Sequence, residues 1–321
     1  MKRVLFLALF LIYIFSLTSY SFELTQYKIF RYKNYISKVA FNKDYLIVGF
    51  ENGTVEIRAF KNNSLIYTLK LPKIHDFAGD LIDMPIYSLD IHKNKLLILT
   101  QGENQSRILF LFDISSRKLK KVFSTKLTLM KAKFLNENKI IFATLADEIV
   151  LYDTKTNSFT YKKQIGNYVF STFALNGSKN LVAIGDESGV VKVFDVSKRK
   201  IIAKIDGINK DKTLALSFFG NLILNASVDK KIGIYNYKTL TLRAQIDTKF
   251  LPYAAILCEN CAIYQVDEQN NIAVYSFNLA SNTQILKGHT MPLIGMGLVK
   301  DTLISYSPAE IILWKIIQKK E

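Results

Sequence analysis

Apolar and polar residues alternate in short runs that repeat along most of the chain. The most regular unit, at 169–205, reads VFSTFALNGSKNLVAIGDESGVVKVFDVSKRKIIAKI. Its apolar runs have the length of strands, and polar turns such as Asp186–Gly189 separate them. Short alternating runs between turn residues are typical of β-strands. The unit therefore predicts an antiparallel sheet of four strands.

The third strand of this unit occurs seven times. The matching segments are VEIRAF (55–60), LFLFDI (109–114), IVLYDT (149–154), VKVFDV (191–196), IGIYNY (232–237), IAVYSF (272–277) and IILWKI (311–316). The first interval between equivalent positions is 54 residues, and the other five lie between 39 and 42. A period near 40 residues with four strands per repeat is typical of β-propeller blades. We therefore expect an all-β protein with seven blades.

The two ends of the chain predict how this ring closes. After IILWKI only IQKKE follows, so the seventh repeat lacks an outer strand. The segment QYKIFRY (26–32) is a spare apolar strand just before the first repeat. Pairing it with the last blade would complete that blade and leave no open sheet edge. We expect residues 22–321 to form this single domain.

The N-terminus has the three-part pattern of a secretory signal peptide. A short basic region precedes the apolar run Val4–Leu17, and small residues follow as far as Ser21. This pattern predicts export and cleavage after Ser21. An uncleaved anchor is the alternative, but a spanning helix needs roughly 20 apolar residues. We therefore expect residues 1–21 to be a cleaved signal and the exported protein not to span a membrane.

A few residues give the chain a resemblance to the WD40 family. They are Gly288, His289, Trp314, Asp113, Asp153 and Asp195. The glycine and histidine precede the first strand of repeat seven, the tryptophan lies in its third strand, and each aspartate follows an aromatic residue. No repeat has an intact Trp-Asp pair, so the chain resembles a diverged, WD40-like propeller. The resemblance implies a structural hydrogen-bond network around His289.

The chain as a whole also resembles the L-type accessory proteins encoded with bacterial periplasmic nitrate reductases. The resemblance rests on the signal-like N-terminus, the lysine-rich ring of this length and the stretch GDLIDMPIYSLDI (79–91). It implies a periplasmic, non-catalytic interaction module whose protein partner belongs to the nitrate reductase system. Two alternatives stay open. One is a general envelope-assembly scaffold, and the other is a propeller enzyme or cofactor-binding protein with a site in the central channel.

The charge balance is strongly basic. The net charge is +16, and it falls to +14 without Lys2 and Arg3. Basic segments recur at similar intervals, at 115–121, 155–163 and 197–204. Lysines on exposed edge strands oppose edge-to-edge association, and we expect that role here. Export argues against a nucleic-acid partner, as does the position of most aromatic residues within strands.

Cys258 and Cys261 stand in LCENCAIY, where the first strand of blade six turns into the second. A hairpin disulfide is one interpretation; free thiols, a redox pair and half of a metal site are the others. A redox pair draws its low thiol pKa largely from a helix N-terminus, and no helix is predicted. A zinc site needs further ligands, and the chain has no other cysteine.

Other candidate chemistry is sparse. Asp147, Asp186, Asp229 and Asp267 precede third strands, where aspartates satisfy backbone donors of tight turns. The sequence does not single out a pair of carboxylates for acid–base catalysis. It contains no nucleophile elbow, phosphate loop or dinucleotide motif. We therefore expect no catalytic residue, no cofactor and no metal.

The long first interval places an insertion at Lys73–Pro85, which reads KIHDFAGDLIDMP. We expect an irregular inter-blade loop on the face with the narrower mouth of the channel. Binding residues are often found on loops held by a rigid scaffold. His75, Asp76, Asp80 and Asp83 are therefore the candidate partner-binding residues. A metal site, or a loop that is merely solvated or caps the channel, is the alternative.

Overall fold

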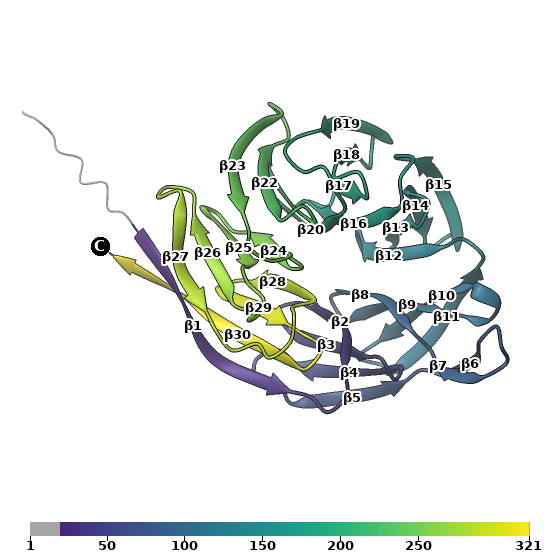
Figure 1. The fold of residues 1–321 in the computed structure, drawn as a ribbon. Helices are drawn as coiled ribbons and strands as arrows, with labels where there is room; N and C mark the ends of the chain where they lie inside the picture. The colour runs from purple at the N-terminus through teal and green to yellow at the C-terminus, as the bar shows by residue number, and fades with distance from the viewer. Residues whose placement is uncertain (1–19, 321) are drawn as a thin grey trace, which may run out of the picture.

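The computed structural model describes residues 20–320, which form seven four-stranded antiparallel sheets around a common axis (Figure 1). This confirms the predicted all-β propeller. Residues 1–19, most of the expected signal peptide, lie outside the described residues, so cleavage after Ser21 and export stay predictions. No helix within residues 20–320 is long and apolar enough to cross a membrane.

In blades one to six the strands run outward from the axis in chain order. Blade one contains β2 (Ile36–Phe41), β3 (Tyr45–Phe50), β4 (Thr54–Ala59) and β5 (Leu65–Lys70), and blade two contains β8 (Ile86–His92), β9 (Lys95–Gln101), β10 (Arg107–Asp113) and β11 (Lys118–Thr125). Blade three contains β12 (Leu129–Phe134), β13 (Lys139–Thr144), β14 (Glu148–Asp153) and β15 (Ser158–Gln164). Blade four contains β16 (Phe170–Leu175), β17 (Leu181–Asp186), β18 (Val191–Asp195) and β19 (Lys200–Ile205).

Blade five contains β20 (Thr213–Phe219), β21 (Leu222–Ser227), β22 (Lys231–Asn236) and β23 (Thr241–Asp247). Blade six contains β24 (Ala255–Leu257), β25 (Cys261–Gln265), β26 (Ile272–Ser276) and β27 (Ser281–Leu286). Blade seven contains β28 (Gly295–Val299), β29 (Thr302–Tyr306) and β30 (Glu310–Lys320). The outer strand of blade seven is β1 (Tyr20–Arg31), so in this blade the order outward is β28, β29, β30 and then β1. Two short strands, β6 (Lys73–His75) and β7 (Leu81–Asp83), and one turn, η1 (Glu103–Gln105), stand outside the blades.

Burial follows the position of a strand within its blade. The second strand of blade four, β17, is buried along its whole length because its two faces pack against neighbouring blades. The outer strand β19 of the same blade is mostly exposed. The basic segments lie along the outer strands β11, β15 and β19. Their lysines thus occupy exposed sheet edges, as expected for residues that discourage edge pairing.

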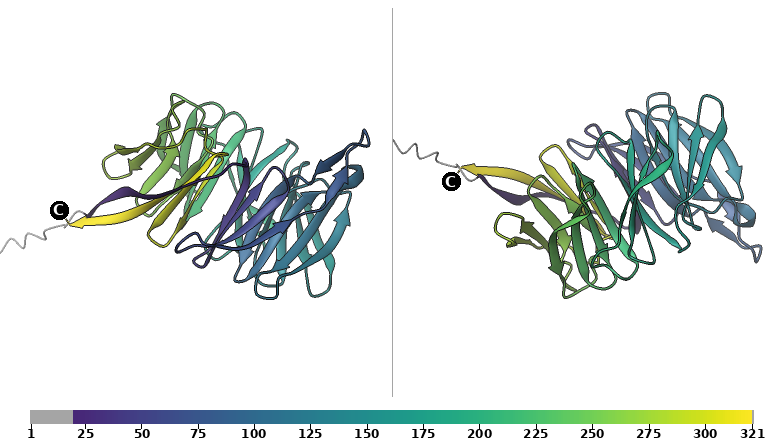
Figure 2. Two further views of the ribbon diagram at one scale, coloured as in Figure 1. Left: turned by 90° about the horizontal axis from the view of Figure 1, so that it is seen from below. Right: turned by 90° about the horizontal axis from the view of Figure 1, so that it is seen from above.

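The ring closes through the two ends of the chain. Strand β1 pairs with β30 in antiparallel register, with Leu24 opposite Ile316 and Phe30 opposite Ile311, and Figures 1 and 2 show the two strands side by side. Leu24 is buried in the core formed with blade six. Its backbone also bonds to the Gln284 side chain of β27, at 2.9 and 2.7 Å. The predicted closing strand is confirmed and is longer than 26–32.

The insertion Lys73–Pro85 is a short hairpin, so the prediction of an irregular loop is wrong. Strands β6 and β7 pair in antiparallel register, with Ile74 opposite Ile82. Figure 2 shows this hairpin projecting from the outer rim of the ring. Of the insertion, only Pro85 lines the cavity along the axis.

Replacement of Leu24 by Ala should lower the free energy of unfolding by about 3 kcal/mol, because it opens a cavity beneath the closing strand. Urea denaturation followed by tryptophan fluorescence measures this, since Trp314 is the single tryptophan and lies opposite Gln26 of β1. The matched control is Tyr27→Ser on the same strand, where the side chain is 44% exposed. Equal destabilisation by the two variants would contradict the closure described above.

Candidate docking site on an inserted hairpin

The base of the β6–β7 hairpin is fixed to the protein core. Ile74 and Met84 are 4% and 2% exposed, and they belong to the apolar cluster that joins blades one and two. Leu71 and Ile108 are members of the same cluster. Burial of two aliphatic side chains stabilises the hairpin by several kcal/mol, at about 1.5–3 kcal/mol each. The hairpin is therefore held at a defined position on the rim.

The tip of the hairpin is a tight turn organised by Asp76. Its carboxylate accepts hydrogen bonds from the backbone N–H groups of Ala78 and Asp80, both at 2.9 Å. The Asp76 N–H in turn donates to the Asp80 carbonyl at 3.0 Å. Gly79 has a φ of +90°, which favours glycine. Asp76 thus shapes the turn through its carboxylate. The partner contact that the sequence predicts for Asp76 would be a second role beside this structural one.

Two large apolar side chains on the hairpin face solvent. Phe77, at the tip, is 96% exposed, and Leu81 is 57% exposed. The sequence interpretation concentrated on the charged residues of the insertion and missed Phe77. The sequence does contain a signal for an exposed Phe77, because it places an aromatic residue within a tight turn, between an Asp and a Gly, and such a turn cannot bury it.

The four predicted docking residues do not converge on one point. His75 Nδ1 lies 3.1 Å from Glu103 Oε1, and this interaction lowers the pKa of the Glu103 carboxyl. Asp83 pairs with Lys70 at 3.2 Å. Asp80 has no hydrogen-bond or ion-pair partner for its carboxylate among the described residues. Residues 20–320 hold no cluster of three His, Cys, Asp or Glu side chains suited to a metal ion.

A groove of about 510 Å³ runs between the hairpin and blade two. Its apolar lining comes from Ile74, Met84, Ile108 and Phe110. Charged residues along it are Lys73, Lys121, Lys126 and Glu103. The hairpin therefore presents an acidic and aromatic tip, and a largely basic groove lies at its base.

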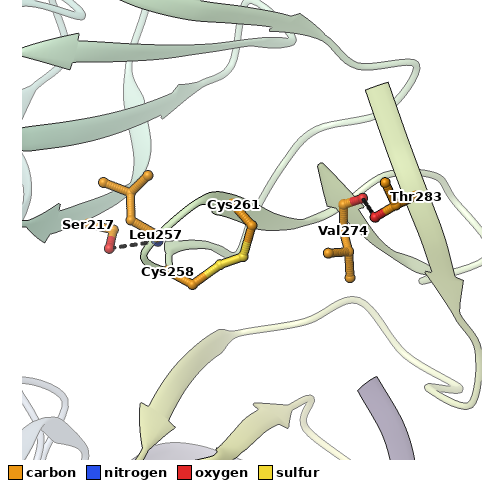
Figure 3. Close-up of a disulfide and its surroundings, with 6 residues drawn as sticks. All are labelled: Ser217, Leu257, Cys258, Cys261, Val274 and Thr283. Carbon is orange, nitrogen blue, oxygen red and sulfur yellow. Dashed lines mark hydrogen bonds between the residues drawn. A yellow bond between two sulfur atoms is a disulfide. The ribbon is translucent and has the colours of Figure 1, made fainter. Parts of the chain in front are cut away.

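The cysteine pair lies where the sequence placed it. Strand β24 ends at Leu257, and Cys258 and Cys261 are joined by a disulfide across the turn into β25 (Figure 3). The Cys258 N–H donates to the Cys261 carbonyl at 2.9 Å. The Leu257 N–H donates to Ser217 Oγ of blade five at 3.0 Å. The disulfide thus closes a short turn on a strand that is tied to the neighbouring blade.

His289 is at the centre of a buried hydrogen-bond network in blade seven. The indole N–H of Trp314 donates to Ser305 Oγ at 2.8 Å, and Ser305 Oγ lies 2.7 Å from His289 Nε2. His289 Nδ1 lies 3.3 Å from Glu310 Oε1. Since the Glu310 carboxylate can only accept, Nδ1 carries the proton that faces it, and in a neutral ring Nε2 then accepts from the Ser305 hydroxyl.

This network links the inner loop of blade seven to its second and third strands. Burial lowers the pKa of His289, which keeps the ring neutral, although the neighbouring Glu310 carboxylate opposes the shift. The sequence interpretation identified Gly288, His289 and Trp314 but not Ser305 or Glu310. A small hydroxyl residue on the strand that pairs with the tryptophan strand was the signal for Ser305.

The aspartates at the ends of third strands are turn-forming residues. Asp113, Asp153 and Asp195 each accept a backbone N–H from the turn that follows, at 2.8 Å. These hydrogen bonds lower the pKa of Asp113 and Asp195. The residues lie at equivalent positions in blades two, three and four, so they repeat one structural device and do not form a shared site.

Two turn aspartates come together in a way that the sequence interpretation did not predict. Asp147 of blade three and Asp186 of blade four flank the ammonium group of Lys192, which is itself buried. Lys192 pairs with Asp186 and lies 3.6 Å from Asp147. The expected backbone-satisfying role is wrong for Asp147, because both of its carboxylate oxygens lack a hydrogen-bond partner. The available signal was a lysine within an otherwise apolar third strand.

No family model matches the chain. An uncharacterized WD repeat-containing protein from Schizosaccharomyces pombe (strain 972) is 26% identical to it over 143 residues. That match covers 41% of this chain and 34% of the yeast protein, so the chain spans about a third of the relative. Together with the seven blades, this similarity indicates a WD-repeat-like propeller, a fold that generally serves protein interaction.

Replacement of Asp147 by Asn should stabilise the protein at pH 7 by on the order of 2 kcal/mol. Burial raises the pKa of Asp147 from 3.8 to about 6, although Lys192 opposes this. A raised carboxyl pKa means that the folded state retains a proton, so stability is lost as pH rises from about 4 to about 6. Urea denaturation between pH 4 and 7 should show this loss in the wild type and much less of it in Asp147→Asn.

The matched variant is Asp186→Asn, which should be destabilising at pH 7. Asp186 accepts from Lys192 and from the Ser188 N–H, so its loss leaves a buried ammonium poorly paired. If Asp147→Asn destabilised the protein as much as Asp186→Asn, the two carboxylates would contribute equally to stability, and the prediction for Asp147 would be wrong.

Replacement of Ser305 by Ala should cost about 2–3 kcal/mol, because it leaves a buried indole N–H and a buried imidazole nitrogen unsatisfied. It should also shift the emission of Trp314, the single tryptophan, as its N–H loses an acceptor. Denaturation and fluorescence spectra measure both effects. Ser158→Ala, at an exposed position on β15, is the control and should leave both unchanged. An unaltered spectrum in Ser305→Ala would be evidence against the network.

Proposed function

We propose that this protein is a periplasmic, non-catalytic docking module that assists the assembly or activity of periplasmic nitrate reductase. The signal-like N-terminus supports the compartment, and the resemblance to the accessory proteins of that system supports the partner. A propeller of the WD-repeat type supports interaction as its general role. The proposal assigns docking to the β6–β7 hairpin.

The exposure of Phe77 is the observation that carries this assignment. It is 96% exposed at the tip of a hairpin whose base is buried through Ile74 and Met84. Aromatic residues are enriched among the few residues that supply most of the binding energy of an interface. A preorganised hairpin also loses little conformational entropy when it binds. Phe77 is therefore positioned as an anchor for a pocket on another protein.

The charges beside Phe77 define the partner surface that would fit it. Asp80 lies three residues along the turn with its carboxylate unpaired, on a protein whose net charge is +14 without Lys2 and Arg3. An acidic tip on a basic protein favours a partner pocket that is apolar within and basic at its rim. The basic surface of the propeller would repel the basic edge of the partner pocket, so the partner would be oriented toward the acidic tip. This geometry supports a specific docking point in preference to general adhesion.

Replacement of Phe77 by Ser should weaken partner capture by about tenfold or more, because an anchor residue of this kind contributes 2 kcal/mol or more. Affinity purification of the tagged protein from the periplasm, with quantitative identification of co-purifying proteins, measures this. Asp80→Asn should give a smaller loss that depends on salt. The control is Leu279→Ser, an apolar residue 68% exposed in a turn of blade six. Equal capture by Phe77→Ser and Leu279→Ser would remove the hairpin from the proposal.

The choice between the nitrate reductase role and a general envelope scaffold depends on loss of the gene. Deletion should reduce periplasmic nitrate reduction or the maturation of its enzyme and leave other exported enzymes unaffected. Loss of many envelope proteins would favour the scaffold. Unchanged nitrate reduction in the deletion strain would contradict the specific role.

A further inference from the structure

The inner strands of five blades surround a cavity of about 800 Å³ on the propeller axis. Its lining comes from β2, β8, β12, β16 and the strands of blade seven. Sites for small organic molecules usually have volumes of about 300–1,000 Å³. The cavity is therefore large enough for such a ligand, and it lies apart from the hairpin on the rim.

Lysines predominate among the charged residues that line this cavity, and they come from blades one and three. The charged residues that line it are Lys38, Lys131, Lys133 and Asp90. Lys133 pairs with Asp90 at 3.0 Å, and Asp90 is the only carboxylate in the lining, so it leaves none for the other two lysines. The side-chain ammonium of Lys38 has no hydrogen bond or ion pair with a described residue. Lys131 donates only to neutral acceptors, Thr172 Oγ1 and the Phe173 carbonyl, both at 2.8 Å. Two ammonium groups thus lack a counter-charge.

The protein surroundings of these two lysines disfavour their charged forms. Burial, together with smaller contributions from the nearby Lys133 and Lys38, lowers the pKa of Lys131 to about 7. Burial also lowers the pKa of Lys38. The Asp90 carboxylate opposes the shift at Lys131 but is already paired with Lys133. An anion between the lysines would restore both charges, as opposite charge favours the protonated form.

The rest of the lining is apolar or offers neutral hydrogen-bonding groups. Phe41, Phe170 and Met296 supply large apolar side chains from three blades. Ser171 Oγ lines the cavity and is buried without a hydrogen-bond partner among the described residues. Tyr306 is neutral, since burial raises its pKa to about 12. A ligand that matches this cavity carries negative charge at one end and an apolar body at the other.

We propose that the axial cavity binds a small organic anion with two negative charges, which pair with Lys38 and Lys131, and an apolar body that packs against the apolar lining beside Phe41 and Met296. Two charges match the two ammonium groups that lack a counter-ion. A phosphate monoester and a dicarboxylate share this chemistry. The site is independent of the docking hairpin and adds a ligand-binding role to the module.

Thermal denaturation and calorimetry with defined probes test this assignment in the whole protein. Phenyl phosphate carries two charges near pH 7.5, because its second pKa is near 6. Phenyl sulfate has the same body with one charge, phenol has none, and inorganic phosphate has no apolar body. We expect phenyl phosphate to bind more tightly than these three. Phthalate tests the dicarboxylate arm, and tighter binding of phthalate would assign the ligand to dicarboxylates.

Matched variants locate the site. Lys38→Met and Lys131→Met should each weaken phenyl phosphate binding by about tenfold or more, since each removes one partner of a charge pair. Lys163→Met on the exposed outer strand β15 changes the net charge by the same amount and should bind normally. Phe77→Ser should also bind normally, which separates this proposal from the docking role. Equal binding by Lys38→Met, Lys131→Met and the control, or no binding by any probe, would overturn the proposal.

Proton uptake gives a readout that adventitious surface binding would not. An anion should raise the pKa of Lys131, so binding near pH 7.5 takes up protons, and affinity falls as pH rises further. Calorimetry in two buffers of different ionisation enthalpy measures the uptake. We expect the uptake to be reduced in Lys131→Met. Binding of phenyl phosphate without proton uptake by the wild type would overturn the role of Lys131.

Discussion

Antiparallel pairing between β1 and β30 connects the two ends of the chain within one sheet, and the positions of all seven blades depend on it. Each blade buries its faces against its neighbours, so an incomplete seventh blade would expose the apolar surface of blades six and one. Closure also fixes the distance of the inner strands from the axis. The cavity wall that holds Lys38 and Lys131 exists only because β2 and β12 belong to a closed ring. The rim hairpin likewise depends on a fixed contact between blades one and two, through Ile74 and Met84.

The sequence predicts the fold well because its main signals are local and repeated. Third strands such as VKVFDV recur at a nearly constant interval, and the spare strand near Gln26 identifies the closing partner. The β6–β7 hairpin escaped prediction because strands of three residues are too short to show alternation. The group of Asp147, Asp186 and Lys192 escaped because it joins two blades, and only the packing of blades brings these residues together. The clustering of lysines around the axial cavity could not be predicted either, because the sequence pattern of a strand does not tell which of its side chains face the axis.

Buried lysines in this protein have two kinds of surroundings. Lys192 lies between two carboxylates, within the interface of blades three and four. Lys131 instead faces a hydroxyl, a carbonyl and the ring of Phe173, whose centroid is 5.1 Å from its ammonium nitrogen. In the first arrangement the protein itself supplies the opposite charge, chiefly from Asp186. The second supplies cationic donors without an opposing charge, which is the arrangement expected where a ligand brings that charge. The same residue type thus serves packing in one place and recognition in the other.

The pairing of the first strand with the last also dictates the order in which the molecule can form. Most blades are built from neighbouring segments and need only short loops to close, so they can form as soon as their own residues are available. Blade seven cannot, because β1 must remain unpaired until β30 exists. Loop closure over almost the whole chain has a high entropic cost, and contacts between distant residues slow folding. We therefore expect the two ends to join late in folding, and until then β1 would be an open strand edge exposed to association with other chains.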